Sequence, residues 1–181
     1  MIVTTLVLLA LSAAASVVPS RASMPHWTTA AIAAVLLTLA AAAGANTDPA
    51  QGVALAATYV VTVLAAVVGG SAIVTAVFRI ARREDSAGPG ATAGPLHGGR
   101  TIGVLERTAV AVSILAGWPE GIAVVLAVKG LARYPELRGN EPSDGSPTAQ
   151  VASASEQFII GTFTSVLWAL AVCGVGRGLA S

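Results

Sequence analysis

Three ionisable residues in an otherwise apolar region have types and a spacing that could support chemistry. Glu106 and Arg107 precede the break Gly117-Trp118-Pro119-Glu120-Gly121, and Lys129 follows it. If the chain folds back at this break, residues equally far from it face each other, so Glu106 lies beside Lys129. A carboxylate next to cations can take up a proton or help to form an anion site. It can also do no more than neutralise its neighbours.

A larger charged cluster is expected at the same depth. It comprises Glu106, Arg107, Lys129, Arg133, Glu136 and Glu156. In the structural interpretation, Glu106 neutralises Lys129 and locks the hairpin, while Arg107 and Arg133 reach out to lipid phosphates. In the functional interpretation, the cluster is an anion or lipid-headgroup pocket, or Glu106 is a protonatable carboxylate in a transport path. The excess of positive charge favours an anionic ligand such as an anionic lipid.

The composition shows where these charges must lie. The chain has 181 residues, of which 55% are hydrophobic and 10% are charged, whereas soluble domains carry about 25% charged residues. Because this leaves too little polarity for a soluble surface, we expect a membrane protein. The net charge of +1 provides no basic field for nucleic acid. A single cysteine cannot form an internal disulfide.

The hydropathy pattern predicts an all-α, polytopic helical membrane protein with a single membrane domain. Six hydrophobic segments are expected at residues 2–18, 28–44, 51–78, 101–118, 119–134 and 156–175, with flexible linkers at 84–100 and 138–155. Pro135 is expected to end the fifth segment. The fourth and fifth segments are short, so they either both span the bilayer or form a re-entrant hairpin. The first segment could be a signal peptide, but no Lys or Arg precedes it, which favours a retained helix.

Positive charges predict the orientation of these segments. Six alternating spans place one set of loop arginines on a single side: Arg21, Arg79, Arg82, Arg83, Arg100, Arg133 and Arg138. The opposite loops carry Asp48 and Glu120, and Arg177 is the exception. The arginine-rich side is therefore expected to be cytoplasmic, with both termini outside a bacterial inner membrane.

Small residues predict where helices approach closely. Gly69-Gly70-Ser71 interrupts the third segment, and Gly161, Ser165, Ala169 and Cys173 recur every four residues in the sixth. Such stripes are typical of packed membrane helices. A hinge is the alternative for Gly69 and Gly70.

Catalytic chemistry is not apparent in the sequence. His26 and His97 lie in separate loops, and no spacing of Cys, His, Asp and Glu suggests a metal site. The glycine-rich stretch from Gly88 to Gly99 lacks the ending of a P-loop. We therefore expect no catalytic residues, no cofactor and no metal. The expected partners are the lipid bilayer and either another membrane protein or a second copy of the chain.

The C-terminal half resembles a known pattern. Three stretches carry the resemblance: Gly99-Arg100-Thr101-Ile102-Gly103-Val104-Leu105-Glu106-Arg107, Ala127-Val128-Lys129-Gly130-Leu131-Ala132-Arg133, and Glu156-Gln157-Phe158-Ile159-Ile160-Gly161-Thr162. They are similar to the C-terminal part of a bacterial family of uncharacterised integral membrane proteins. The chain departs from that pattern at Gly130, where Ser is usual, and its N-terminal half lacks a His- and Asp-containing motif of longer relatives.

The resemblance implies a set of functional residues but no reaction. That set is Glu106, Arg107, Lys129, Arg133, Glu156 and Gly161. We expect a non-enzymatic membrane component or complex subunit that presents a charged hairpin at the cytoplasmic side. The alternatives are a small oligomeric ion or anion transporter or channel, and a protein or enzyme that binds lipid headgroups.

Overall fold

The computed structural model of the chain describes residues 2–15, 27–84, 99–138 and 148–181, and every regular element in these ranges is a helix. The helices are α1 (Ile2–Ala15), α2 (Trp27–Gly44), α3 (Val53–Glu84), α4 (Gly99–Leu115), α5 (Glu120–Arg138) and α6 (Thr148–Ala180). The predicted all-α class is therefore confirmed. Two helices in the described ranges are long and apolar enough to cross a membrane, at Val53–Phe78 and Phe158–Ala180.

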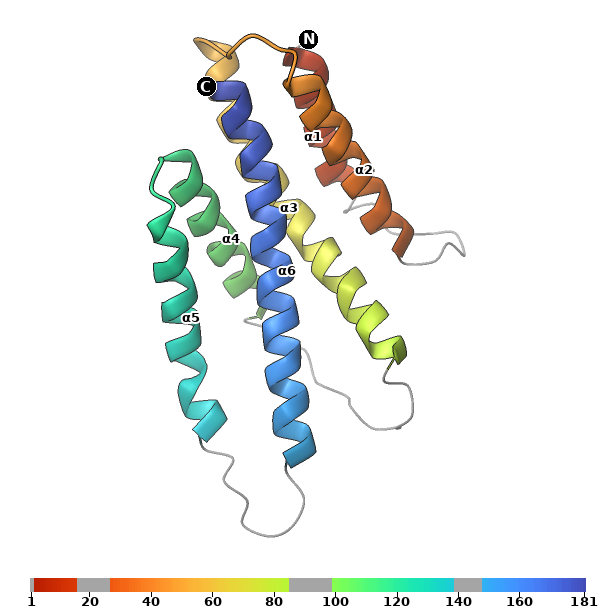
Figure 1. Cartoon of the computed structure of the whole chain (residues 1–181), viewed down its shortest axis with the longest axis vertical. Helices are drawn as coiled ribbons and strands as arrows, with labels where there is room; N and C mark the ends of the chain where they lie inside the picture. Colours follow the sequence, from red (N-terminus) through yellow and green to blue (C-terminus); the bar gives the residue numbers. More distant parts are fainter. Residues whose placement is uncertain (1, 16–26, 85–98, 139–147) are drawn as a thin grey trace.

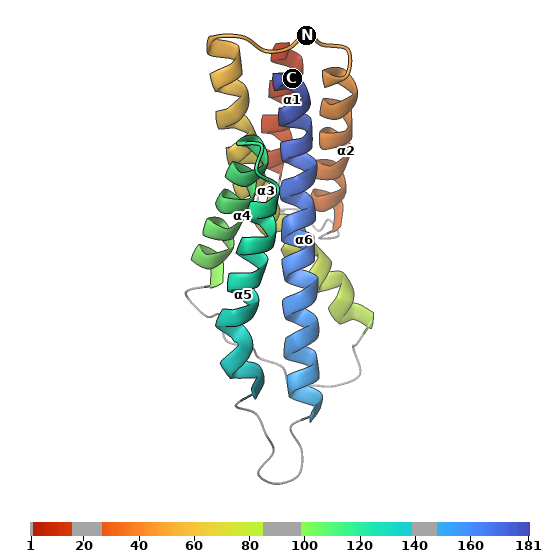
Figure 2. The same cartoon turned by 60° about the vertical axis from the view of Figure 1, so that its left-hand side comes forward.

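The helices run roughly along one axis and form an elongated bundle (Figure 1). Both ends of the chain lie at the same end of the bundle, beside the connection between α2 and α3. The long helices α3 and α6 cross in the middle and share the most extensive interface. The hairpin α1–α2 packs on one side of this pair and the hairpin α4–α5 on the other, and the second view shows the same arrangement (Figure 2).

Several helix boundaries differ from those expected. α5 continues through Pro135 to Arg138, so the prediction that Pro135 ends this segment is wrong. A proline removes one backbone hydrogen bond of the helix. Pro135 lies in the last turn of α5, where only three residues follow it, so the helix can end at Arg138 rather than at the proline. α6 begins at Thr148 rather than Glu156, because the turn-forming Gly145 and Pro147 come before Thr148 and no Gly or Pro follows until Gly161. The expected linkers otherwise lie largely outside the described residues, as do residues 16–18 of the first segment.

Small side chains form most of the bundle interior. Six alanines, on α2, α3, α4 and α6, are at most 1% exposed: Ala33, Ala40, Ala65, Ala66, Ala111 and Ala169. An alanine side chain takes up little space, so the helix backbones can approach each other closely. The large apolar side chains lie mainly on the outside instead, including Val3, Val7 and Leu11 of α1 and Ile159, Phe163 and Leu167 of α6.

A short glycine turn joins α4 to α5. Gly117 has a φ of 74°, and its N–H donates to the Ile114 carbonyl at 3.1 Å, while the Trp118 N–H donates to the Ser113 carbonyl at 2.9 Å. This pair of bonds is a Schellman motif with glycine at its left-handed position. Pro119 then opens α5, where its missing N–H has no cost. The turn therefore fixes α4 and α5 as an antiparallel hairpin through local interactions.

Replacing Gly117 tests this turn. Gly117→Ala forces a side chain into the left-handed region and should lower the free energy of unfolding by about 1 kcal/mol. The matched control is Gly130→Ala in α5, where an added Cβ meets nothing within 4 Å, and this variant should be neutral or more stable because alanine favours a helix. Denaturation in detergent micelles, followed by circular dichroism, measures both. Equal effects at the two positions would contradict the assigned role of Gly117.

Candidate functional site

Glu106 of α4 and Lys129 of α5 form an ion pair across the hairpin. The Glu106 side chain is 5% exposed and the Lys129 side chain is 23% exposed. The ammonium group also lies 5.4 Å from the centre of the Phe158 ring of α6, a distance typical of a cation–π contact. The pairing expected from the hairpin spacing is thus present, and it joins α4, α5 and α6 at one level of the bundle.

Arg107 points away from this ion pair into the interface of α3 and α6. Its Nε donates to the Val67 carbonyl of α3 at 2.9 Å, and Nη1 donates to Ser165 Oγ of α6 at 3.4 Å. The residue is 5% exposed, so the expectation that Arg107 reaches outward to lipid phosphates is wrong. Within the described ranges, no carboxylate lies within 4.0 Å of its guanidinium. Its nearest partners are therefore neutral acceptors.

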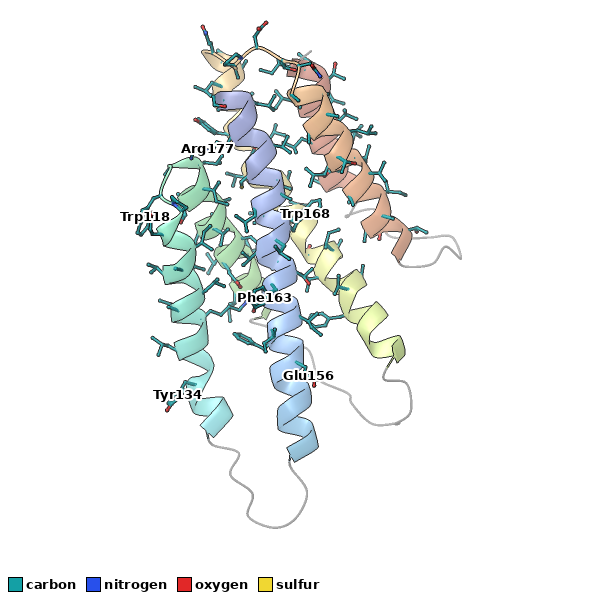
Figure 3. All side chains as sticks on the ribbon, viewed as in Figure 1. Trp118, Tyr134, Glu156, Phe163, Trp168 and Arg177 are labelled. Carbon is teal, nitrogen blue, oxygen red and sulfur yellow. The ribbon has the colours of Figure 1, made fainter. Side chains whose placement is uncertain are left out.

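A pair of glycines in α3 makes room for these large side chains. A Cβ added at Gly70 would overlap Arg107 Cδ, and one added at Gly69 would lie 2.7 Å from Trp168 Cε2. Trp168 of α6 also donates from Nε1 to the Ala65 carbonyl of α3 at 3.2 Å. Gly69 and Gly70 thus form a notch in α3 that receives one side chain from α6 and one from α4. The labelled Trp168 lies near the middle of α6 (Figure 3).

The small residues of α6 face the same interior. Gly161 lies against α3, because an added Cβ would be 2.8 Å from Phe78 Cζ. Ser165 and Ala169 are buried, and Ser165 accepts the hydrogen bond from Arg107. These positions therefore hold α3 and α4 close to α6.

One member of the expected cluster is not brought to it, and two others have side chains outside the described part of the chain. Glu156 is exposed near the lower end of α6, and no ion pair to it is found among the residues that the structure places. Arg133 lies on α5, and its side chain falls outside the described part of the chain, as does that of Glu136. The described cluster thus consists of Glu106, Lys129 and Arg107, with Arg107 in a separate setting.

Arg177 has a role that sequence reasoning missed. Its Nη1 donates to the Ile114 carbonyl at 2.8 Å, in the last turn of α4, and the side chain also lies beside Gly117. Arg177 is thus a second donor to a carbonyl that already accepts from the Gly117 N–H, and a cation at a helix C-terminus is favoured by the helix dipole. Figure 3 shows Arg177 at the level of the α4–α5 turn. The sequence signals this role only by placing a single arginine in an apolar segment. Assigning Ile114 as its partner requires knowing which residues of α4 and α6 lie at the same level.

Glu106 Oε1 on α4 and Thr162 Oγ1 on α6 are among the buried polar atoms of the described residues that have no hydrogen-bond partner. A search of the described residues finds no group of three His, Cys, Asp or Glu side chains that could hold a metal ion.

Comparison with known proteins gives no match. No family model, no curated protein and no solved structure matches the chain. The resemblance to a bacterial membrane-protein family therefore stays a prediction.

The glycine notch gives a direct test of how Arg107 is held. Gly70→Ala should lower the free energy of unfolding by about 1–3 kcal/mol, because the new methyl group displaces the Arg107 stem from its carbonyl acceptor. Gly174→Ala in α6 is the control, since a Cβ there meets nothing within 4 Å. Denaturant titration in micelles compares the two variants. A Gly70→Ala protein as stable as the Gly174→Ala protein would contradict the packing of Arg107 against Gly70.

Proposed function

We propose that the protein is a multi-pass component of a bacterial inner membrane, without enzymatic activity, that works as a structural or complex-forming subunit. In this proposal the charged residues hold the α4–α5 hairpin on the α3–α6 pair. The hairpin then presents one fixed surface at the cytoplasmic side. The proposal rests on one observation: the described charged groups of the interior bind partners within the chain.

Each buried or half-buried cation in the described bundle is engaged inside the chain. Lys129 pairs with Glu106, and Arg107 donates to Val67 and Ser165. Arg177, although exposed, donates to Ile114. Cations that are engaged in this way stabilise the contacts between helices, so they favour a structural role over a catalytic one.

The outward faces of the helices support a membrane location. In the most apolar 18-residue stretch of each long helix, only 33% of the residues of Val53–Phe78 and 39% of those of Phe158–Ala180 are buried. The core helix of a soluble protein would be mostly buried, whereas these helices turn apolar side chains outward. A bilayer accepts such surfaces, and water does not.

Aromatic side chains near the two ends of α5 agree with a bilayer. Trp118 precedes the helix and is 54% exposed, and Tyr134 near its other end is 48% exposed. They are separated by about 24 Å along the helix at 1.5 Å per residue. Trp and Tyr gather at the two membrane–water interfaces. The spacing is somewhat shorter than a hydrocarbon layer of about 30 Å, so α5 would cross it nearly upright.

Sequence charge sets the orientation of the proposed bundle. α3 continues beyond Phe78 with Arg79, Arg82 and Arg83, so its last turns are suited to the cytoplasmic interface and to anionic lipids. Asp48 lies on the loop before α3, and Glu120 lies at the start of α5, so both are away from this arginine-bearing end of α3 (Figure 1).

Cysteine labelling in whole cells tests this topology. The buried Cys173 is first replaced by Ala. Single cysteines are then placed at the exposed positions Asp48, Glu120 and Glu156. A membrane-impermeant maleimide should label Asp48→Cys and Glu120→Cys in intact cells, and Glu156→Cys only after the membrane is opened. Labelling of all three in intact cells would refute the proposed crossing of α5 and α6.

Native mass spectrometry of gently purified protein tests the subunit role. The expected result is a stoichiometric membrane-protein partner or a defined homo-oligomer. A stable monomer without a partner would contradict the role. A homo-oligomer that retains a small solute would favour the transporter alternative instead, because Glu106 keeps one carboxylate oxygen without a partner.

A further inference from the structure

The interface between the α4–α5 hairpin and α6 contains two polar atoms whose hydrogen-bonding capacity is unused. Glu106 Oε2 accepts from Lys129, but Oε1 has no partner, and neither does Thr162 Oγ1. Glu106 and Thr162 are each 7% exposed. A buried polar atom without a partner costs about 1–3 kcal/mol, so two of them in one interface call for a shared explanation.

The contacts on either side indicate that Thr162 of α6 lies at the level of Glu106 of α4. Glu106 and Arg107 are neighbours on α4. Lys129, the partner of Glu106, contacts Phe158 of α6, and Arg107 donates to Ser165 of α6. Phe158, Thr162 and Ser165 are spaced by four and three residues, so they share one face of a helix. Thr162 therefore lies between the two points where α6 meets the charged groups.

The direction of Thr162 agrees with this placement. Successive residues of a helix turn by about 100°, which sets Thr162 about 40° from Phe158 and about 100° from Gly161. Gly161 faces Phe78 of α3, and Phe158 faces Lys129 of α5. Thr162 thus turns away from α3 and toward the hairpin, on the side where Glu106 meets Lys129.

We propose that one internal water molecule binds between Glu106 Oε1 and Thr162 Oγ1 and links the hairpin to α6. A carboxylate oxygen only accepts hydrogen bonds, whereas a hydroxyl both donates and accepts. A water molecule can donate one hydrogen bond to Glu106 Oε1 and form a second with Thr162 Oγ1 in either direction. A metal cation is disfavoured because the Lys129 ammonium already occupies the same carboxylate. An anion is disfavoured because the carboxylate repels it.

A double-mutant cycle measures this link. Thr162→Val removes the hydroxyl at almost constant volume, and the combined variant Glu106→Met with Lys129→Met removes the ion pair without leaving one charge alone. Thr62→Val is the matched control, because Thr62 Oγ1 is also buried without a partner but lies against Gly176 rather than beside a charge. Each is compared by its unfolding equilibrium in detergent micelles.

The expected pattern separates a water link from an idle hydroxyl. Thr162→Val should lower the folding equilibrium constant by about threefold to tenfold in the native background, and should cause no loss in the methionine background. Thr62→Val should give the same small change in both backgrounds. If Thr162→Val is harmless in the native background, or equally harmful in both, the proposal is wrong.

A second measurement keeps the proposal testable if the methionine variant fails to fold. A high-resolution electron-density map of the native protein should show a peak within hydrogen-bond distance of both oxygens, and the Thr162→Val protein should lack it. A map with no peak, or with the two oxygens in direct contact, would overturn the proposal.

Discussion

The burial of the Arg107 guanidinium is the constraint on which the rest of the structure depends. A cation inside an apolar bundle is costly unless its donors find acceptors. Here these are the Val67 carbonyl and the Ser165 hydroxyl, so three helices must meet at one level. Val67 lies near the middle of the apolar stretch Val53–Phe78. The charge is therefore held far from either end of this stretch, and Gly70 leaves the space for its stem.

Much of the architecture could be predicted from the sequence, for identifiable reasons. Long apolar runs separated by Gly and Pro predict helices of the observed number and order, and the break at Gly117 predicts the hairpin. The pairing of Glu106 with Lys129 follows from the same break, because a tight turn fixes which residues of its two arms face each other. These features depend on interactions between residues close in the chain.

The parts that sequence reasoning missed depend on contacts between distant residues. Whether Arg107 turns outward to lipid or inward to α3 is decided by Gly70, which lies 37 positions earlier in the chain. Arg177 can contact the last turn of α4 only because the α4–α5 turn lies at the same level of the bundle as Arg177 on α6. The early start of α6 is different, because the turn-forming residues of the expected linker all lie at or before Pro147, and no Gly or Pro follows until Gly161.

The contact of Arg177 with the last turn of α4 has a consequence for the order of assembly. The Schellman turn and the Glu106–Lys129 pair join elements that are neighbours in the chain, so the α4–α5 hairpin can form as soon as both helices are made. Arg177 and Ser165, in contrast, belong to α6, which follows the hairpin in synthesis. Until α6 is in place, Arg107 has only its α3 acceptor and the tip of the hairpin is unanchored. Packing of α6 is then the step that converts a loosely attached hairpin into a fixed part of the bundle.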